Sequence, residues 1–158
     1  MIFVTLGTQK FQMNRLIRAV DKLASETDEK FFIQSGHSTY KPEHCVCQSF
    51  LSKEEYRDKI ESCRILITHA GVGTIIEGIT AGKPVIVVPR LAAMKEHVDD
   101  HQKQIAEAFG NKRCVLNCED LDNLGNYLNK AESFKFEPYE VKGGNIEEII
   151  LDFIDIFD

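Results

Sequence analysis

The stretch RILITHAGVGTIIEGITAGKPVIVVPR, residues 64–90, combines two short apolar runs with a glycine-containing turn and an amphipathic segment between them. Residues 64–68 and 84–88 are mostly apolar and rich in β-branched side chains, a pattern typical of buried strands. Residues 74–81 are predicted to form a helix that ends at Gly82. A strand, a helix and a second strand in succession predict a βαβ unit with parallel strands.

The remaining chain continues this alternation of strands and helices. The predicted strands, all short and apolar, cover residues 2–6, 31–34, 46–50, 64–68, 84–88 and 114–116. The predicted helices cover residues 14–25, 74–81, 100–109 and 121–130, and a further helix begins at Ser52, where Glu55 completes a capping box. This order predicts an α/β fold over residues 1–132, a Rossmann-like parallel sheet with helices on both faces.

Residues 133–158 form a second segment, in which a loop is followed by an apolar helix. The loop contains Pro138, and the helix is predicted over residues 145–157. Its apolar side chains follow helical spacing and form one stripe, which comprises Ile146, Ile149, Ile150, Phe153, Ile154 and Phe157. Such a stripe packs either on the helix's own domain or on a partner, and the sequence leaves both possibilities open.

The composition indicates an ordinary globular domain. The chain has 158 residues, 43% of them hydrophobic, and a formal net charge of −6. This charge argues against nonspecific binding to nucleic acid, which depends on clustered Lys and Arg. No apolar run approaches the roughly 20 residues that span a bilayer, and the first residues read as a strand instead of a signal peptide. We therefore expect a cytoplasmic protein that reaches a membrane only through a surface patch or a partner.

Five cysteines are present, and their odd number without a secretion signal favours reduced thiols over disulfides. They are Cys45, Cys47, Cys63, Cys114 and Cys118. A zinc site at His44, Cys45 and Cys47 is conceivable, but the spacing lacks the paired C-x2-C pattern. The sequence therefore favours buried structural thiols and predicts no bound metal.

The turn after residues 64–68 carries the residues best suited to bind a ligand. Gly71 and Gly73 allow a tight turn and leave backbone N–H groups uncovered. The predicted helix directs the positive end of its dipole toward the same place, and Thr74 adds a hydroxyl. Together they predict an anion site for a diphosphate. The chain contains neither a P-loop motif nor a complete GxGxxG fingerprint, so this turn belongs to neither class.

Two further features support a nucleotide ligand. Glu77 lies about one turn into that helix, where its carboxylate could accept hydrogen bonds from both hydroxyls of a ribose. An acid in a helix is most often a solvated surface residue, but the position of Glu77 near the glycine-containing turn supports a role in binding the ligand. Gly7 and Thr8 follow the first predicted strand, where their backbone N–H groups either face the same crevice or only form a turn.

A second polar cluster follows the strand at residues 84–88, at the edge where open parallel sheets bind ligands. His101 and Gln102, at the start of a predicted helix, are candidates to hydrogen-bond sugar hydroxyls. Asp99 and Asp100 are candidates for the same role or for capping the helix, and at least one of them is expected to cap it.

These residues occur in a recognisable order, namely His69-Ala-Gly-x-Gly-Thr74, Glu77, Gly82-Lys-Pro84, Pro89 and His101-Gln102. Together with residues 3–8, this order resembles the C-terminal domain of glycosyltransferase family 28 across residues 1–110. Full GT-B enzymes carry two Rossmann-like halves, so the resemblance implies a single GT-B half-domain. The chain is similar to the donor-binding subunits of split enzymes, such as bacterial PssE-type polysaccharide proteins and the eukaryotic UDP-N-acetylglucosamine transferase catalytic subunit.

The resemblance implies a role for each candidate residue in binding a UDP-sugar. The residues implied in binding the diphosphate are Gly7, Thr8, His69, Gly71, Gly73 and Thr74. Glu77 is implied in binding the ribose, and the residues that would contact the donor sugar are Asp100, His101 and Gln102. No cofactor or metal is implied, because helix ends and side chains can stabilise the leaving diphosphate. The base that activates the acceptor is expected from a partner subunit.

The function implied is the transfer of a hexose from a UDP-sugar to a lipid-diphosphate-linked acceptor, in capsule or exopolysaccharide synthesis. The partner would be a membrane-attached, acceptor-binding glycosyltransferase subunit, and the reaction would take place at the cytoplasmic face of the membrane. An alternative from another class is a noncatalytic protein that stabilises or enhances such an enzyme. A free-standing epimerase-like enzyme of the same superfamily is a further alternative, but it would need a second half.

Overall fold

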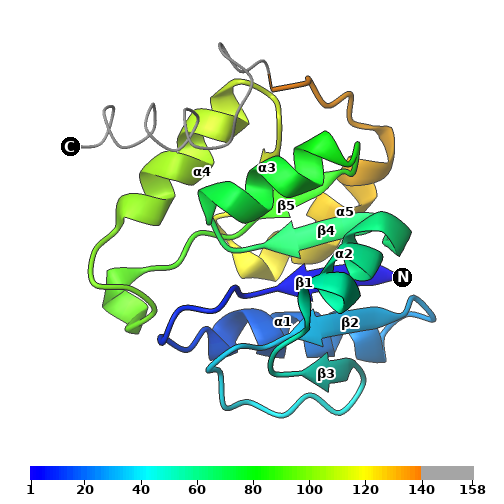
Figure 1. The fold of residues 1–158 in the computed structure, drawn as a ribbon, viewed down its shortest axis with the longest axis vertical. Helices are drawn as coiled ribbons and strands as arrows, with labels where there is room; N and C mark the ends of the chain where they lie inside the picture. Colours follow the sequence, from blue (N-terminus) through cyan, green and yellow to red (C-terminus); the bar gives the residue numbers. More distant parts are fainter. Residues whose placement is uncertain (140–158) are drawn as a thin grey trace.

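The computed structural model describes residues 1–139, which form a layer of strands between two layers of helices (Figure 1). The strands are β1 (Ile2–Thr5), β2 (Phe31–Gln34), β3 (Val46–Gln48), β4 (Ile65–Thr68), β5 (Val85–Val87) and β6 (Leu116–Asn117). The α-helices are α1 (Asn14–Ser25), α2 (Lys53–Ser62), α3 (Val72–Thr80), α4 (His101–Asn111) and α5 (Leu124–Ser133). Short 3-10 turns are η1 (Ala92–Met94) and η2 (Leu121–Asn123). The helix predicted over residues 145–157 lies outside the described residues.

The strands form one parallel sheet in the order β3-β2-β1-β4-β5-β6. β1 pairs with β2 on one side and with β4 on the other, so that Ile2 is aligned with both Phe31 and Ile65. The chain winds outward from β1 in both directions, which is the doubly wound arrangement of Rossmann folds. The predicted α/β class with a parallel sheet is confirmed.

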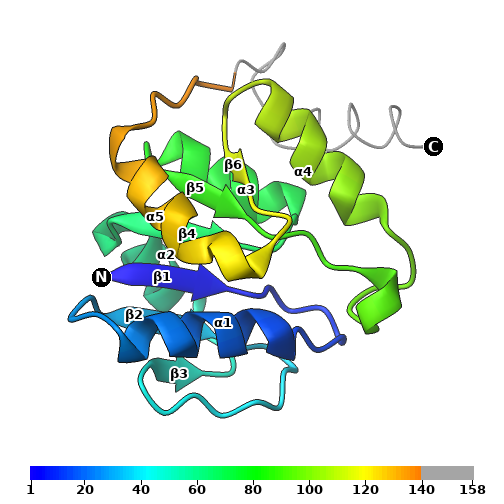
Figure 2. The same cartoon turned by 180° about the vertical axis from the view of Figure 1, so that it is seen from behind.

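Helices cover both faces of this sheet, as the two opposite views show (Figures 1 and 2). α1 and α5 pack on one face, against side chains that include Val4 and Ile67. α2, α3 and α4 pack on the other face, against side chains that include Phe3 and Leu66. Successive strand residues therefore enter opposite cores, which explains why the strands read as continuous apolar runs. None of the helices within residues 1–139 is long and apolar enough to cross a membrane.

The capping box at the start of α2 is confirmed, whereas the last strand is displaced. The hydroxyl of Ser52 accepts the N–H of Glu55 at 3.1 Å, and the Glu55 carboxylate accepts the N–H of Ser52 at 2.8 Å. These reciprocal bonds fix the first residue of the helix as the sequence predicted. The final strand was predicted at residues 114–116, but the chain pairs with β5 only at Leu116 and Asn117.

The prediction of buried thiols holds for three cysteines, which are Cys63, Cys114 and Cys118. Cys45 is half-buried, and Cys47 is exposed on β3, so the prediction was wrong for Cys47. β3 forms one edge of the sheet, and all three of its residues are exposed. Within residues 1–139, no three His, Cys, Asp or Glu side chains are grouped so that they could hold a metal ion.

Candidate functional site

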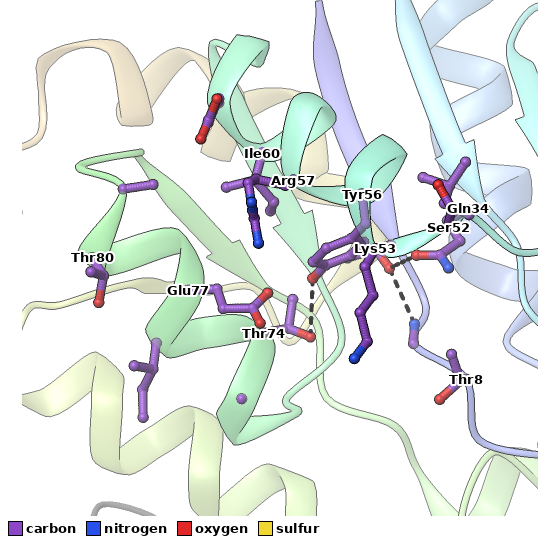
Figure 3. A pocket seen from close by; sticks show the side chains of 17 residues that line it. Thr8, Gln34, Ser52, Lys53, Tyr56, Arg57, Ile60, Thr74, Glu77 and Thr80 are labelled. Carbon is purple, nitrogen blue, oxygen red and sulfur yellow. Dashed lines mark hydrogen bonds between the residues drawn. The ribbon is translucent and has the colours of Figure 1, made fainter. Parts of the chain in front are cut away.

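A cavity of about 720 Å³ lies between α2 and α3 and extends to the ends of β1 and β2 (Figure 3). The carboxyl edge of an open parallel sheet is where such folds bind ligands. The predicted site residues that line it are Gly7, Thr8, Gly73, Thr74 and Glu77. The sequence reasoning missed the wall that comes from α2, whose contributors include Ser52, Lys53, Tyr56 and Arg57.

The N-terminus of α3 supplies one wall of the cavity. Gly71 is its N-cap residue, with φ −82° and ψ 120°, and no side chain caps the helix. The helix begins at Val72, so Gly73 and Thr74 lie in its first turn, and the prediction that Gly73 shapes a loop before the helix was wrong. The first N–H groups of a helix have no partner within it and carry the positive end of its dipole. Among residues 1–139, a Cβ at Gly73 would meet no atom within 4 Å, so a ligand can approach the backbone there.

Tyr56 extends from α2 to α3 across the cavity (Figure 3). Its hydroxyl donates a hydrogen bond to Oγ1 of Thr74 at 3.4 Å, and its ring meets that of Phe3 edge-on, with centroids 5.7 Å apart. Burial, together with the charge of Glu77, raises the pKa of Tyr56 to about 12. The phenol therefore stays protonated and links the two helices. Its spacing of four residues from the buried Ile60 could have indicated this inward position.

Two cationic side chains of α2 line the same cavity as Glu77 of α3. Lys53 and Arg57 lie four residues apart, hence on one face of the helix, and both are exposed (Figure 3). They place positive charge at this cavity although the chain as a whole has a formal net charge of −6. An anionic ligand in the cavity would meet two cations and a helix N-terminus.

Buried polar groups form the end of the cavity beside β1 and β2. The hydroxyl of Thr5 donates to Oε1 of Gln34 at 2.8 Å and accepts the N–H of Gly7 at 3.3 Å. Both side chains are buried at the last residues of their strands. Gly7 has a φ of 72°, in the left-handed region that favours glycine. These bonds fix the backbone where Gly7 and Thr8 line the cavity.

His69 and Gln102 form a buried pair beside the cavity. His69 directly follows β4 and is only 5% exposed, and its Nδ1 lies 3.1 Å from Nε2 of Gln102. Gly7 and Gly71 enclose the imidazole so closely that a Cβ on either would lie 2.5 Å from a ring atom. Burial, and then the positive charge of Arg90, lower the pKa of His69 to about 3, so the ring is neutral at physiological pH.

Internal hydrogen bonds occupy the amide of Gln102. Its Oε1 accepts the backbone N–H of Ala70 at 3.1 Å and that of Arg90 at 3.0 Å, while its Nε2 faces His69. The side chain is 3% exposed and does not line the cavity. Contact between Gln102 and a donor sugar therefore stays a prediction, and the observed bonds join the ends of β4 and β5 to the start of α4.

Arg90, which the sequence reasoning missed, fastens the loop after β1 to the loop after β5. Its guanidinium is 1% exposed and donates to the carbonyls of Leu6, Phe11 and Glu96. The buried carboxylate of Glu96 pairs with Arg15 of α1 at 2.8 Å. Arg90 lies three residues after Val87, the last residue of β5, and because arginine is rarely buried, the sequence gives no signal for this network.

The other sugar-contact candidates lie at the start of α4. Asp100 occupies the N-cap position, and its carboxylate accepts the N–H of Ala92 at 3.0 Å. Asp100 itself makes no side-chain capping bond, and it is Asp99, the residue before the N-cap, that accepts the N–H of His101 at 2.9 Å. Neither Asp100 nor His101 lines the cavity, so their contacts with a sugar stay predictions.

A doubly wound parallel sheet with an open glycine-containing helix start at its carboxyl edge is the architecture of one half of a GT-B glycosyltransferase. The sequence motifs and this fold thus indicate the same class. The chain belongs to the family described as the glycosyltransferase family 28 C-terminal domain, whose model matches residues 1–155. That match includes every candidate residue of the site.

Curated relatives are similar over parts of the chain. UDP-N-acetylglucosamine transferase subunit ALG13 of Homo sapiens is 30% identical over 113 residues, which cover 66% of this chain and 10% of that protein. The same subunit of Saccharomyces cerevisiae is 32% identical over 78 residues, which cover 49% of this chain and 37% of that protein. The matched part thus spans about a tenth of the human relative and little more than a third of the yeast one.

Solved structures share the fold at low sequence identity. The solution NMR structure of ALG13 has a TM-score of 0.62 at 17% identity, over 99% of this chain and 96% of that chain. The calicheamicin glycosyltransferase CalG4 has a TM-score of 0.65 at 15% identity, over 84% of this chain and 33% of that chain. MurG of Acinetobacter baumannii has a TM-score of 0.55 at 19% identity, over 82% of this chain and 41% of that chain. These likenesses confirm the fold as a single GT-B half-domain.

Proposed function

We propose that this protein is the UDP-sugar-binding subunit of a heteromeric glycosyltransferase. The reaction transfers a hexose from the UDP-sugar to a lipid-diphosphate-linked acceptor, in capsule or exopolysaccharide synthesis. The observation that carries the proposal is the cavity where a helix N-terminus, two cations and a carboxylate line one space. The name of the human relative, a UDP-N-acetylglucosamine transferase subunit, supports the same class of ligand.

The cavity offers a chemically suitable wall to each part of UDP. The first-turn N–H groups at Gly73 and Thr74, with the charges of Lys53 and Arg57, suit the diphosphate. Glu77, further along α3, suits the ribose because a carboxylate accepts several hydrogen bonds from hydroxyls. The apolar side chains that suit the flat face of uracil are Leu51, Ile60 and Ile76.

The chemistry that these residues support is stabilisation of the leaving group. When the bond between the sugar and the diphosphate breaks, negative charge develops on the oxygen that UDP retains. The helix N-terminus and the two cations stabilise that charge without a metal ion. Neither His69, with a pKa of about 3, nor the protonated Tyr56 suits a general base at neutral pH. In this proposal the acceptor's base comes from the partner, as the family resemblance implies.

The proposed partner is a membrane-attached, acceptor-binding subunit at the cytoplasmic face of the membrane. Support comes from the names of the curated relatives, since the human and yeast proteins that the chain matches are both called UDP-N-acetylglucosamine transferase subunits. Two large apolar side chains in the loop between β5 and α4, Met94 and Val98, are 54% and 74% exposed. Apolar groups of this kind suit contact with a second protein.

Titration calorimetry with UDP tests the binding function. Glu77→Ala removes the acceptor proposed for the ribose, and each hydrogen bond to a charged group is worth about 1.5–3 kcal/mol. We therefore expect at least a tenfold loss of affinity. Glu107→Ala, which removes an exposed acid of α4 outside this cavity, is the matched control and should bind UDP as the wild type does. Equal affinities of the Glu77 and Glu107 variants would refute the proposed ribose site.

A turnover assay with the partner subunit separates this function from a noncatalytic stabilising role. If this chain binds the donor, Glu77→Ala should leave complex formation intact and abolish most of the sugar transfer. If the chain only stabilises its partner, the Glu77 variant should support transfer as well as the wild type does.

A further inference from the structure

The amide of Gln102 has only one orientation that its neighbours allow. The backbone N–H groups of Ala70 and Arg90 both reach its Oε1, at 3.1 and 3.0 Å. A reversed amide would place its NH2 group against two donors, so the carbonyl oxygen must occupy this position. The NH2 group then faces Nδ1 of His69 at 3.1 Å.

This orientation determines where the proton of His69 resides. Because the amide NH2 can only donate, Nδ1 of the imidazole must be the acceptor and carries no proton. The ring is neutral, since burial and then the charges of Arg90 and His97 disfavour its protonation. A neutral imidazole with a bare Nδ1 holds its proton on Nε2.

Nε2 of His69 faces the gap between two glycines. A Cβ on Gly7 would lie 2.5 Å from Nε2, and one on Gly71 would lie 2.7 Å from it. Gly7 lines the cavity, and Gly71 is the N-cap of α3. Among residues 1–139 no hydrogen bond reaches Nε2, although the side chain is only 5% exposed. An unused donor therefore lies beside the uncapped start of a nine-residue helix.

We propose that Gln102 is a positioning residue that holds His69 as the Nε2–H tautomer, so that His69 donates a hydrogen bond to a phosphate oxygen of the nucleotide. The proposal rests on the proposed function for its ligand, a nucleoside diphosphate. In this proposal Gln102 acts through its hydrogen bond to His69 instead of contacting the sugar. The imidazole is a neutral donor, and its contribution to binding stays constant across physiological pH.

The first test measures the tautomer in the ligand-free full chain with 15N-labelled histidine, and the His69→Asn variant assigns the ring. We expect a protonated Nε2, a bare Nδ1 and no titration between pH 5 and 8. A proton on Nδ1, or a ring that titrates in this range, would overturn the proposal. Because no nucleotide is present, this result is independent of whether the protein binds UDP.

The second test reverses the hydrogen bond with Gln102→Glu. The carboxylate still accepts both backbone N–H groups, but its second oxygen can only accept from His69, which draws the proton to Nδ1. At pH 8, where an ordinary imidazole is neutral, we expect the Nδ1–H tautomer and at least a tenfold loss of UDP affinity. An unchanged tautomer or an unchanged affinity would overturn the proposal. If the variant does not fold, the wild-type tautomer decides alone.

A double-mutant cycle distinguishes positioning from direct contact. If Gln102 acts through His69, adding Gln102→Glu to His69→Ala should change UDP affinity no further. Direct contact with the sugar would instead weaken binding of UDP-sugar more than that of UDP, and this difference would persist in the His69→Ala background. That second outcome would refute the positioning role.

Discussion

Replacing Gly7 with alanine tests the packing of the loop after β1 on His69 with a single added carbon atom. Gly7 has a φ of 72°, where a residue other than glycine costs about 1–2 kcal/mol. The new Cβ would lie 2.5 Å from Nε2 of His69, so the ring must move. That movement strains its 3.1 Å hydrogen bond to Gln102, which is worth about 1 kcal/mol. We expect Gly7→Ala to lower the free energy of unfolding by about 2–3 kcal/mol.

Urea denaturation followed by circular dichroism measures this loss, with Gly73→Ala as the matched control. At Gly73 an added Cβ meets no atom of the described part of the chain within 4 Å, and the residue lies within α3. Alanine has the higher helix propensity there, so this variant should be stabilised by about 0.5–1 kcal/mol. If the free energy of unfolding of Gly7→Ala lies within about 0.5 kcal/mol of the wild-type value, as for an ordinary surface substitution, the packing argument is refuted.

Three further predictions concern buried and exposed charges. Arg90→Met leaves buried carbonyls without donors and should lower the free energy of unfolding, measured by urea denaturation, by about 3–5 kcal/mol. A loss below about 1 kcal/mol would contradict a stabilising role for the hydrogen bonds of the Arg90 guanidinium. His69 has a folded pKa of about 3, below its ordinary 6.5, so the unfolded chain binds a proton that the folded chain does not. The contribution of the neutral ring to the free energy of unfolding is complete above pH 6.5 and falls toward pH 3 by up to about 1.4 kcal/mol per pH unit. In urea denaturation, the wild type should therefore lose more stability between pH 7 and pH 5 than His69→Asn does. Equal losses in the two proteins would count against a buried neutral ring. Replacing Lys53 and Arg57 together with methionine should weaken UDP binding at least tenfold and flatten its salt dependence in calorimetry, whereas an unchanged salt dependence would exclude both cations from the site.

The fold could be predicted from the sequence because its elements are locally encoded. The run at Ile65–Thr68 is apolar on both faces, and such runs alternate with segments of helical periodicity along the chain. The capping box of Ser52 and Glu55 marks a helix start by side-chain chemistry alone. The start of α3 was harder, because a glycine N-cap makes no side-chain hydrogen bond and gives no such signal.

The site was predictable where its residues are neighbours in the sequence. Thr74 and Glu77 lie three residues apart on one helix, so a single stretch of sequence shows a hydroxyl and a carboxylate placed beside the glycine-containing turn. The wall from α2 was missed because it depends on how the crossover from β3 to β4 lays that helix beside α3. In the sequence, Lys53 and Arg57 look like ordinary solvated side chains of an amphipathic helix.

The pair His101-Gln102 shows a further limit. Adjacent residues of an α-helix point about 100° apart, so they rarely share one environment. Here Gln102 is 3% exposed and bonded to groups at the ends of β4 and β5, while His101 is half-buried at the first position of α4. Which of the two turns inward is decided by the position of α4 on the sheet, and the motif alone does not contain that information.

The two sides of the candidate site differ in rigidity, and this difference can be measured. His69 and Gln102 are buried and held by hydrogen bonds before any ligand arrives, whereas Lys53, Arg57 and Glu77 are exposed. Preorganised donors lose no conformational freedom on binding, while exposed long side chains lose rotamer entropy when a ligand orders them. Substitutions on the buried side should therefore reduce both stability and UDP affinity, and those on the exposed side should reduce affinity alone. A stability loss in the exposed-side variants as large as that in the buried-side variants would show that the cavity walls act as one structural unit.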